Sequence, residues 1–483
     1  MKNNILLVCS AIVFMLLSES CQTKSNNQSD SSTLKTYQPI NVIMENLRHY
    51  VKYDDNIIAF KNASVVDGTG KSIESNQTII IENGLIKAIG NNFKLNIPEK
   101  AKVIDLKGKT IIPGIVGMHN HLHILRFPYV GDIAAKLYLA AGVTTIQTCG
   151  AASPEKELLL SQNIAIGNQI GPEIISSAPF ITGEGGNPNM IIPKNEQHLR
   201  DTIQYWMNQG VKWFKVYRNT KPNDLKTILD EVHKNGGKVR GHLCSITFEE
   251  ATKMGIDGIE HGLNSSSDFR TNKEWGKCNG GREYIDNLII NSPEVKKLQK
   301  LMIEKGVFLT STLSIYEASI PNRAYADERS IKTMSPYLKE QYEERRKNFE
   351  NQLEDSTRNK RLKRIMEFEY QYFKMRGLLC SGVDAGRHIL PGFGDQRNYK
   401  LLMEAGFTSE EAIQIMTNNG AKALERSDIG SIQAGKRADF VILNGNLDRE
   451  PSIIEKVETV FKNGIGYNPQ LILNETLGQF AKE

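Results

Sequence analysis

Two histidines separated by one residue end the segment 113–121, PGIVGMHNH, which is apolar and strand-like after its Pro-Gly start. Because side chains alternate faces along a strand, His119 and His121 project to the same side, where one divalent metal ion can bind both. On a helix the same two side chains would diverge by about 200°. Surface strands also carry such pairs by chance, so the pair becomes informative only together with later residues.

A lysine in a second strand-like segment, 211–217, is the next candidate. Alternation places Lys215 with Trp213 and Tyr217 on one face and Phe214 and Val216 on the other. If the aliphatic face meets helices, Lys215 points inward, where a charged amine needs a partner or must lose its charge. Reaction with carbon dioxide would give a carbamate whose two oxygens bridge two cations. An ordinary salt bridge is the alternative.

Three further residues with ligand-type side chains end later strand-like segments: His242, His261 and Asp384. Either histidine, taken singly, fits a hydrogen-bonded core position equally well. Their shared location at strand ends favours a site, because catalytic residues of parallel barrels lie at the carboxyl ends of the strands. A carboxylate at position 384 is suited both to contact a metal and to accept a proton from water.

The elements expected to position these residues are short buried strands that alternate with helical stretches, a pattern typical of a parallel sheet. Eight such units predict a closed (β/α)8 barrel over residues 113–427. The strand candidates are Ile115 to His121, Val143 to Thr148, Glu173 to Ala178, Val211 to Tyr217, Lys238 to Leu243, Gly258 to His261, Val307 to Thr312 and Leu378 to Asp384. Helical segments are expected near Gln396 to Ala405 and Ser409 to Leu424.

Strand and turn patterns occupy both flanks of the barrel. The Asn83-Gly84 pair between two β-rich runs is a strong hairpin signal. Residues 56–112 and 428–475 are therefore predicted to form one small β-sandwich domain built from both ends of the chain.

Two spacers between strands are too long for bare barrel loops: 263–305 and 313–376. The second is dense in Glu, Lys, Arg and Tyr and is predicted to form exposed helices. Both follow strands and so belong to the face that carries active sites. A lid or substrate wall is one interpretation, and solvated decoration or an oligomer contact is the other.

The first residues have the pattern of a targeting segment. Residues 1–20 combine Lys2 with a short apolar run and predict a signal peptide, and Cys21 then resembles the lipidated cysteine of bacterial lipoproteins. Residues 21–55 are expected to be a tether and linker. This predicts an exported, membrane-anchored protein facing the periplasm or cell surface, with plain secretion as the alternative. The net charge of +5 over 483 residues indicates no nucleic-acid partner.

The four cysteines of the expected mature domain are widely scattered: Cys149, Cys244, Cys278 and Cys380. None forms a CxxC motif, so neither a disulfide framework nor a thiolate metal site is predicted. Cysteine inside apolar strand-like runs usually behaves as a small hydrophobic residue.

Taken in order, these motifs resemble the amidohydrolase superfamily, metal-dependent hydrolases on a (β/α)8 barrel, in the branch related to imidazolonepropionase and certain prolidases. The matching segments are Pro113-Gly114 before His119-x-His121, 141–145 (AGVTT), 214–216 (FKV), His242, 258–262 (GIEHG), 382–386 (GVDAG), 429–432 (IGSI) and 435–442 (GKRADFVI). The resemblance spans roughly Ile57 to Gly464.

The resemblance implies roles for the matching residues. His119, His121 and Asp384 would bind an inner metal, His242 and His261 an outer one, and carboxylated Lys215 would bridge them. Zinc suits this ligand set, although manganese, iron and cobalt also fit. The ions would activate a water molecule, and Asp384 would transfer its proton to the leaving amine. In single-metal relatives the carbamate is absent, and one ion would be held without Lys215.

Two departures from the pattern bear on substrate and local packing rather than on hydrolysis. Gly117 stands where many relatives have Asp, and Gln147-Thr148 stands where the branch often has Arg-Asp. Neither position is a metal ligand in the pattern.

Residues just beyond two strands are candidates for contact with a substrate carboxylate: Tyr217, Arg218, Arg387 and His388. The leading hypothesis is an amidohydrolase that cleaves an amide or peptide bond, including Xaa-Pro or other dipeptide bonds. A cyclic-amide hydrolase or a deaminase is the first alternative, and an inactive binding lipoprotein is the alternative of another class. A homo-oligomer is compatible with this interpretation.

Overall fold

The computed structural model describes residues 43–92, 94–123, 128–281, 283–321, 323, 326–350, 356–386 and 388–482. These residues belong to one compact unit with a mixed α/β fold. The expected signal peptide, Cys21 and the tether up to residue 42 lie outside the described residues. The described part of the expected linker holds a short 3-10 helix (Glu45–Tyr50) and strand β1 (Val51–Tyr53), which pairs with β17 (Ile465–Tyr467).

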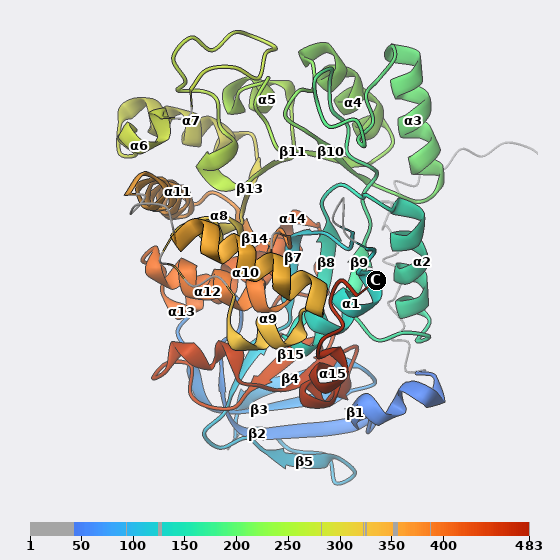
Figure 1. Cartoon of the computed structure of the whole chain (residues 1–483). Helices are drawn as coiled ribbons and strands as arrows, with labels where there is room; N and C mark the ends of the chain where they lie inside the picture. Colours follow the sequence, from blue (N-terminus) through green and yellow to red (C-terminus); the bar gives the residue numbers. More distant parts are fainter. Residues whose placement is uncertain are drawn as a thin grey trace, which may run out of the picture. The chain divides into compact units, whose positions relative to one another are not determined.

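Eight parallel strands form the centre of the unit, and each corresponds to a predicted strand (Figure 1). They are β7 (Ile115–Asn120), β8 (Val143–Thr148), β9 (Glu173–Ile175), β10 (Trp213–Val216), β11 (Lys238–Gly241), β12 (Gly258–Glu260), β13 (Phe308–Ser311) and β14 (Leu379–Ser381). Most end slightly earlier than predicted. As a result His121, His242 and His261 directly follow their strands, and Asp384 lies three residues after the end of β14.

The eight strands do not pair in one continuous sheet. Strands β7, β8 and β9 form one parallel sheet, and β10 to β14 form another. Isolated parallel bridges, Ser177 with Trp213 and Ile181 with Val216, connect the two sheets. Among the described residues no ladder joins β14 to β7, so the predicted closed barrel is not confirmed.

These strands are buried on both faces, as expected for parallel strands that helices cover. Every residue of β7, β8, β10 and β13 is buried. Helices follow the strands and cover them (Figure 1). These helices are α1 (Gly131–Ala140), α2 (Pro154–Ala165), α3 (Glu196–Asn208), α4 (Pro222–Lys234), α5 (Phe248–Met254), α7 (Pro293–Glu304), α12 (Phe393–Glu404), α13 (Ser409–Met416) and α14 (Asn418–Ala423).

Strands from both ends of the described chain share one nine-stranded sheet rather than two facing sheets, so the predicted sandwich is not confirmed. The register pairs Phe440 with Pro113, which ties the late strands to the segment that leads into β7. The Asn83-Gly84 hairpin is confirmed, with both residues at positive φ. The remaining strands are β2 (Ile57–Val65), β3 (Glu74–Glu82), β4 (Leu85–Asn91), β5 (Lys102–Asp105), β6 (Thr110–Pro113), β15 (Phe440–Leu443) and β16 (Val457–Lys462).

The two long spacers are helical. The first holds a 3-10 helix (Gly262–Ser265), α6 (Tyr284–Asn287) and α7. The second holds α8 (Leu313–Glu317), α9 (Glu328–Thr333), α10 (Pro336–Glu350) and α11 (Ser356–Lys374). A 3-10 helix (Pro451–Glu455) and α15 (Pro469–Thr476) lie near the C-terminus. No helix of the described part is both long and apolar enough to cross a membrane.

The prediction that the second spacer forms exposed helices is wrong for α11. Leu362, Ile365, Phe368 and Tyr372 are all buried and share one face of this helix. The spacing of three and four residues brings these side chains onto one side, which packs into the main core. The charged residues between them hid this pattern in the sequence.

A disulfide joins Cys244 and Cys278, so the expectation of no disulfide was wrong for this pair. The two cysteines are 34 residues apart in sequence, and their Cα atoms lie 4.9 Å apart. The bond fastens the first spacer to the loop after β11. Cys149 and Cys380 are buried free thiols, in agreement with the role of small hydrophobic residues.

Replacing both Cys244 and Cys278 by serine is expected to lower the free energy of unfolding by about 2–4 kcal/mol, because the crosslink restricts the unfolded chain. Denaturant unfolding under oxidising conditions measures the difference. A reducing agent should destabilise the parent protein and leave the double variant unchanged. Equal sensitivity of both proteins to reduction would contradict the assignment.

Candidate active site

A cavity of about 490 Å³ opens at the carboxyl ends of the parallel strands. This volume is in the range that binds small molecules. All six residues predicted as metal ligands line it: His119, His121, Lys215, His242, His261 and Asp384. Residues that are far apart in sequence are thus brought to one place.

The end of β14 lies directly against β7. The backbone N–H of Asp384 donates to the carbonyl oxygen of His119 at 2.8 Å. A Cβ atom on Gly382 would stand 2.2 Å from the backbone nitrogen of His119, so only glycine permits this approach. The Gly-Val-Asp sequence therefore delivers the carboxylate to the first histidine.

Two of the lining residues have left-handed backbone conformations: His261 at φ 70° and Asp384 at φ 47°. Such conformations are uncommon for residues other than glycine and concentrate at functional sites, where neighbouring contacts hold them. His261 directly follows β12 and Asp384 lies three residues after β14, and both residues line the cavity.

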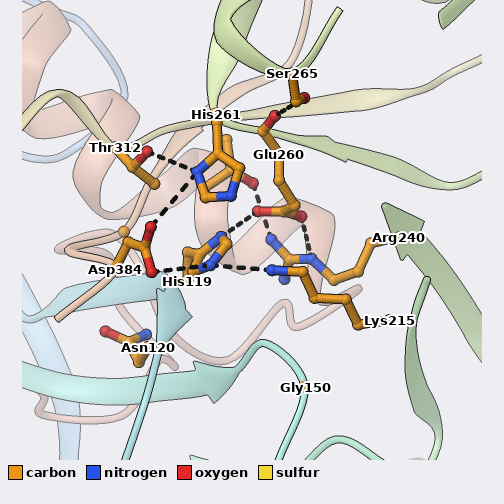
Figure 2. A network of polar contacts seen from close by, with 12 residues as sticks. His119, Asn120, Gly150, Lys215, Arg240, Glu260, His261, Ser265, Thr312 and Asp384 are labelled. Atoms are coloured by element: carbon orange, nitrogen blue, oxygen red, sulfur yellow. Dashed lines mark hydrogen bonds and ion pairs between the residues drawn. The ribbon is translucent and has the colours of Figure 1, made fainter. Parts of the chain in front are cut away.

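The side chains converge on the Asp384 carboxylate (Figure 2). Its Oδ1 lies 3.0 Å from His121 Nε2 and 3.5 Å from His119 Nε2, and its Oδ2 lies 3.7 Å from His261 Nδ1. Two ligand atoms of a tetrahedral zinc ion are separated by roughly 3.3 Å, so this spacing fits a metal. Ligand atoms of His119, His261 and Asp384 all lie within 4.8 Å of one another and form a possible metal-binding group.

The protonation state of His119 also suits a metal. Burial, reinforced by the Lys215 charge, lowers the pKa of His119 to about 3, so its ring is neutral near pH 7. Its Nδ1 lies 2.5 Å from Glu260 Oε2. Burial tends to raise the pKa of Glu260, but Arg240 and His119 hold that pKa well below its usual value. An ionised carboxylate only accepts, so Nδ1 donates its proton and the lone pair of Nε2 faces the cavity.

Glu260 is itself anchored by Arg240, and both side chains are fully buried. The guanidinium also donates to Gln147 and, at 2.9 Å, to Thr310 Oγ1. It lies over the rings of Trp213 and Phe308 at 5.8 and 5.1 Å. These buried charges are tolerated because each has a partner of opposite charge. The network fixes the orientation of His119.

Lys215 lies inside, as its alternation predicted, while Phe214 and Val216 join the main core. Its Nζ donates to His119 Nε2 at 3.1 Å. The ammonium group therefore uses the same lone pair that a metal would need. A metal at His119 requires this amine to move or to lose its charge.

His242 is less closely joined to the other ligands. Its ring centroid is 4.5 Å from that of His261 and 4.7 Å from that of Tyr217. Burial, followed by the charge of His261, lowers its pKa well below the usual value and keeps the ring neutral. The Nδ1 atom of His261 lies 2.9 Å from Thr312 Oγ1, which orients that ring.

Two of the predicted substrate-binding residues line the cavity: Tyr217 and Arg218. His388 is buried and lies outside this lining, with its ring 5.7 Å from that of Tyr342. The prediction for Arg387 falls outside the described residues.

Sequence reasoning missed Glu260 and Arg240 as individual participants. Glu260 belongs to the segment 258–262 (GIEHG), in which only His261 was predicted to have a role. The sequence did contain a signal, since each of two short buried strands carries one charged residue. Because buried charges need partners, the two could have been predicted to pair. Gln147, a departure from the family pattern, contacts Arg240.

Glu260→Gln is expected to weaken metal binding by about 10–100-fold, because the residue that orients His119 loses its charge. The free energy of unfolding should also fall, since Arg240 keeps a buried charge without its partner. Chelator competition measures the first effect and denaturant unfolding the second.

Glu173→Gln is the matched control. This carboxylate also pairs with buried or half-buried arginines, Arg437 and Arg426, but it lies outside the cavity lining. Its replacement should lower stability and leave metal affinity unchanged. If Glu260→Gln lowers stability but leaves metal affinity unchanged, Glu260 has no role in orienting His119.

Solved structures with a similar fold include two enzymes named for peptide hydrolysis. A putative prolidase from Bifidobacterium longum has a TM-score of 0.64 at 22% identity, covering 87% of this chain and 99% of that one. A Xaa-Pro dipeptidase with bound methionine has a TM-score of 0.63 at 19% identity, covering 85% and 100%. At these identities the likeness shows the fold.

Proteins of similar sequence include dihydroorotases. A dihydroorotase from Thermoanaerobacter sp. (strain X514) is 24% identical over 395 residues, 80% of this chain and 87% of that protein. One from Elusimicrobium minutum (strain Pei191) is 48% identical over 62 residues, only 13% of each chain. The model of the amidohydrolase family matches residues 110–466, which is most of the chain. The chain therefore belongs to the amidohydrolase family and is a hydrolase of carbon–nitrogen bonds.

Proposed function

We propose that this protein hydrolyses an amide or peptide bond in a small substrate with the help of one or two divalent metal ions, and that dipeptides are the favoured substrates. The carrying observation is the convergence of His119, His261 and Asp384 within 4.8 Å in a cavity of about 490 Å³. That volume suits a ligand of dipeptide size. The similarity to prolidase and dipeptidase structures supports the peptide substrate.

Zinc suits the imidazole and carboxylate donors best. His119, His121 and Asp384 would hold one ion, and His242 and His261 a second one. Conversion of Lys215 to a carbamate would free the lone pair of His119 and supply two bridging oxygens. When bound, the metal polarises the substrate carbonyl and makes water more acidic.

The remaining chemistry belongs to side chains of this chain. Burial tends to raise the pKa of Asp384, but His119, His121 and His261 hold it well below its usual value. Its carboxylate is thus ionised near neutral pH and able to accept the proton of the attacking water. The same group then returns that proton to the departing amine. Glu260 keeps His119 in the tautomer that the site requires.

The architecture and location are part of the proposal. The eight parallel strands support a (β/α)8 barrel, with the site at its carboxyl face as in other barrels. The Cys244–Cys278 disulfide supports export, because disulfides persist in oxidising compartments. A lipid on Cys21 would then attach the enzyme to a membrane.

A cyclic amide is the second candidate substrate. The sequence relatives named dihydroorotase favour it, and the proposed machinery is compatible with opening a ring amide. Assay of the purified protein on dipeptides and on dihydroorotate in parallel separates the two.

His261→Ala and Asp384→Asn are each expected to lower kcat/KM by at least ~10²-fold, because a metal ligand or the proton-transferring carboxylate is lost. Steady-state hydrolysis of the best dipeptide in the panel measures this. Circular dichroism should show an unchanged fold.

His233→Ala is the matched histidine control. His233 is partly exposed and pairs with Asp257 at 2.7 Å, outside the cavity lining. Its replacement should leave hydrolysis unchanged. Full turnover in either site variant would refute the assigned site.

Removal of metal by a chelator should abolish hydrolysis, and zinc or manganese should restore it. Elemental analysis gives the number of ions per chain. Full activity in metal-free protein would eliminate the proposed mechanism.

A further inference from the structure

We propose that helix α11 selects the substrate by charge, and that the preferred amide carries a second carboxylate which Arg361 and Arg358 bind. This inference rests on the proposed hydrolase function and extends it to a substrate class, acidic dipeptides. The residues involved lie in the spacer 313–376.

One face of α11 forms a wall of the cavity. Arg358, Arg361, Leu362 and Ile365 all line it. Their spacing of three, four and seven residues places them on one side of a helix. Leu362 and Ile365 are 2% and 1% exposed, so the face is fixed in the core while its two guanidinium groups reach the cavity.

The charges of the lining are unbalanced. Arg218, Arg358 and Arg361 contribute three guanidinium groups, whereas Asp384 is the one carboxylate among the described lining residues. Asp384 is also surrounded by histidines and is assigned to the reaction. Arginine stays charged at any physiological pH, and a concave site with weak solvent screening strengthens its attraction for anions.

Arg361 has capacity to bind a further group. Its Nη2 lies 3.4 Å from Asp286 Oδ2, a long contact for a charged pair. Its Nε is buried and has no hydrogen-bond partner among the described residues. A guanidinium offers five donors in a planar fork that matches a carboxylate. The Asp286 contact therefore positions the side chain without using its donors up.

Arg358 is held against the same wall. Its Nη1 donates to the carbonyl oxygen of Ser319 at 2.6 Å, and Ser319 lines the cavity as well. This contact fixes the guanidinium beside α8, one helical turn from Arg361. Two arginines on one helix face form a suitable anchor for one carboxylate.

Arg218 provides a second carboxylate-binding group on another element, so the cavity is suited to a substrate with two carboxylates. Arg218 follows β10, and its Nη2 lies 3.7 Å from the disulfide sulfur of Cys278. We assign Arg218, together with Tyr217, to binding the first carboxylate, which is the C-terminal carboxylate of a dipeptide. The α11 pair then remains for the carboxylate of an acidic side chain.

The test compares isosteric dipeptides, Ala-Glu with Ala-Gln and Glu-Ala with Gln-Ala, on the metal-loaded enzyme. For at least one pair, kcat/KM is expected to be about tenfold or more higher for the acidic dipeptide, because hydrogen bonds to charged groups are stronger. Arg361→Gln should reduce that ratio to less than about threefold, mainly through KM. Arg361→Lys keeps the charge and should retain part of the preference.

Arg364→Gln is the matched control, since Arg364 lies on the same helix, pairs with Glu367 and does not line the cavity. It should leave the ratio unchanged. The double variant Arg361→Gln with Asp286→Asn removes both charges and guards against destabilisation by an unpaired Asp286. Equal loss of activity on acidic and neutral dipeptides would mean that Arg361 is structural, and would overturn the inference.

Binding distinguishes this inference from the proposed function. Calorimetry of the parent protein with glutamate and glutamine, the products at issue, needs no turnover. Stronger binding of glutamate that Arg361→Gln abolishes supports the inference even if no amide is hydrolysed, a result that would refute the hydrolase proposal alone. Equal binding of glutamate and glutamine, or hydrolysis without acidic preference, overturns the inference.

Discussion

The buried contact between His119 and Glu260 is the interaction on which the site depends. It leaves the proton on Nδ1 and directs the lone pair of Nε2 into the cavity. Glu260 keeps its charge only because Arg240 lies beside it, and Arg240 is tolerated in the core because Glu260, Gln147 and two aromatic rings surround it. Loss of one member would leave a buried charge unmatched.

The strands make this network possible. Parallel strands end at one face, so β7, β10, β12 and β14 bring His119, Lys215, Glu260 and Asp384 together despite their separation in sequence. Close approach of β14 to β7 depends on Gly382, and the left-handed turn at Asp384 returns its carboxylate to the histidines. Local backbone strain is thus part of the positioning of the site.

The two long spacers contribute residues to the walls of the cavity. A disulfide fastens the first spacer beside Arg218, and the buried face of α11 fixes the second. The proposed reacting groups lie at or just after the strand ends, whereas two of the three wall arginines, Arg358 and Arg361, belong to the second spacer. The two proposals therefore assign chemistry to the strand ends and charge selectivity to α11, a division that is common where one fold supports several substrates.

Local patterns in the sequence predicted the eight strands, the hairpin at Asn83-Gly84 and eight of the cavity residues, because alternation and strand ends are local features. Folding, by contrast, established the Glu260–Arg240 network, the Cys244–Cys278 bond, the buried face of α11 and the split of the strands into two sheets. These depend on which distant side chains meet. A charge or a thiol in the sequence does not specify its partner, since burial and distance arise only when the chain is folded.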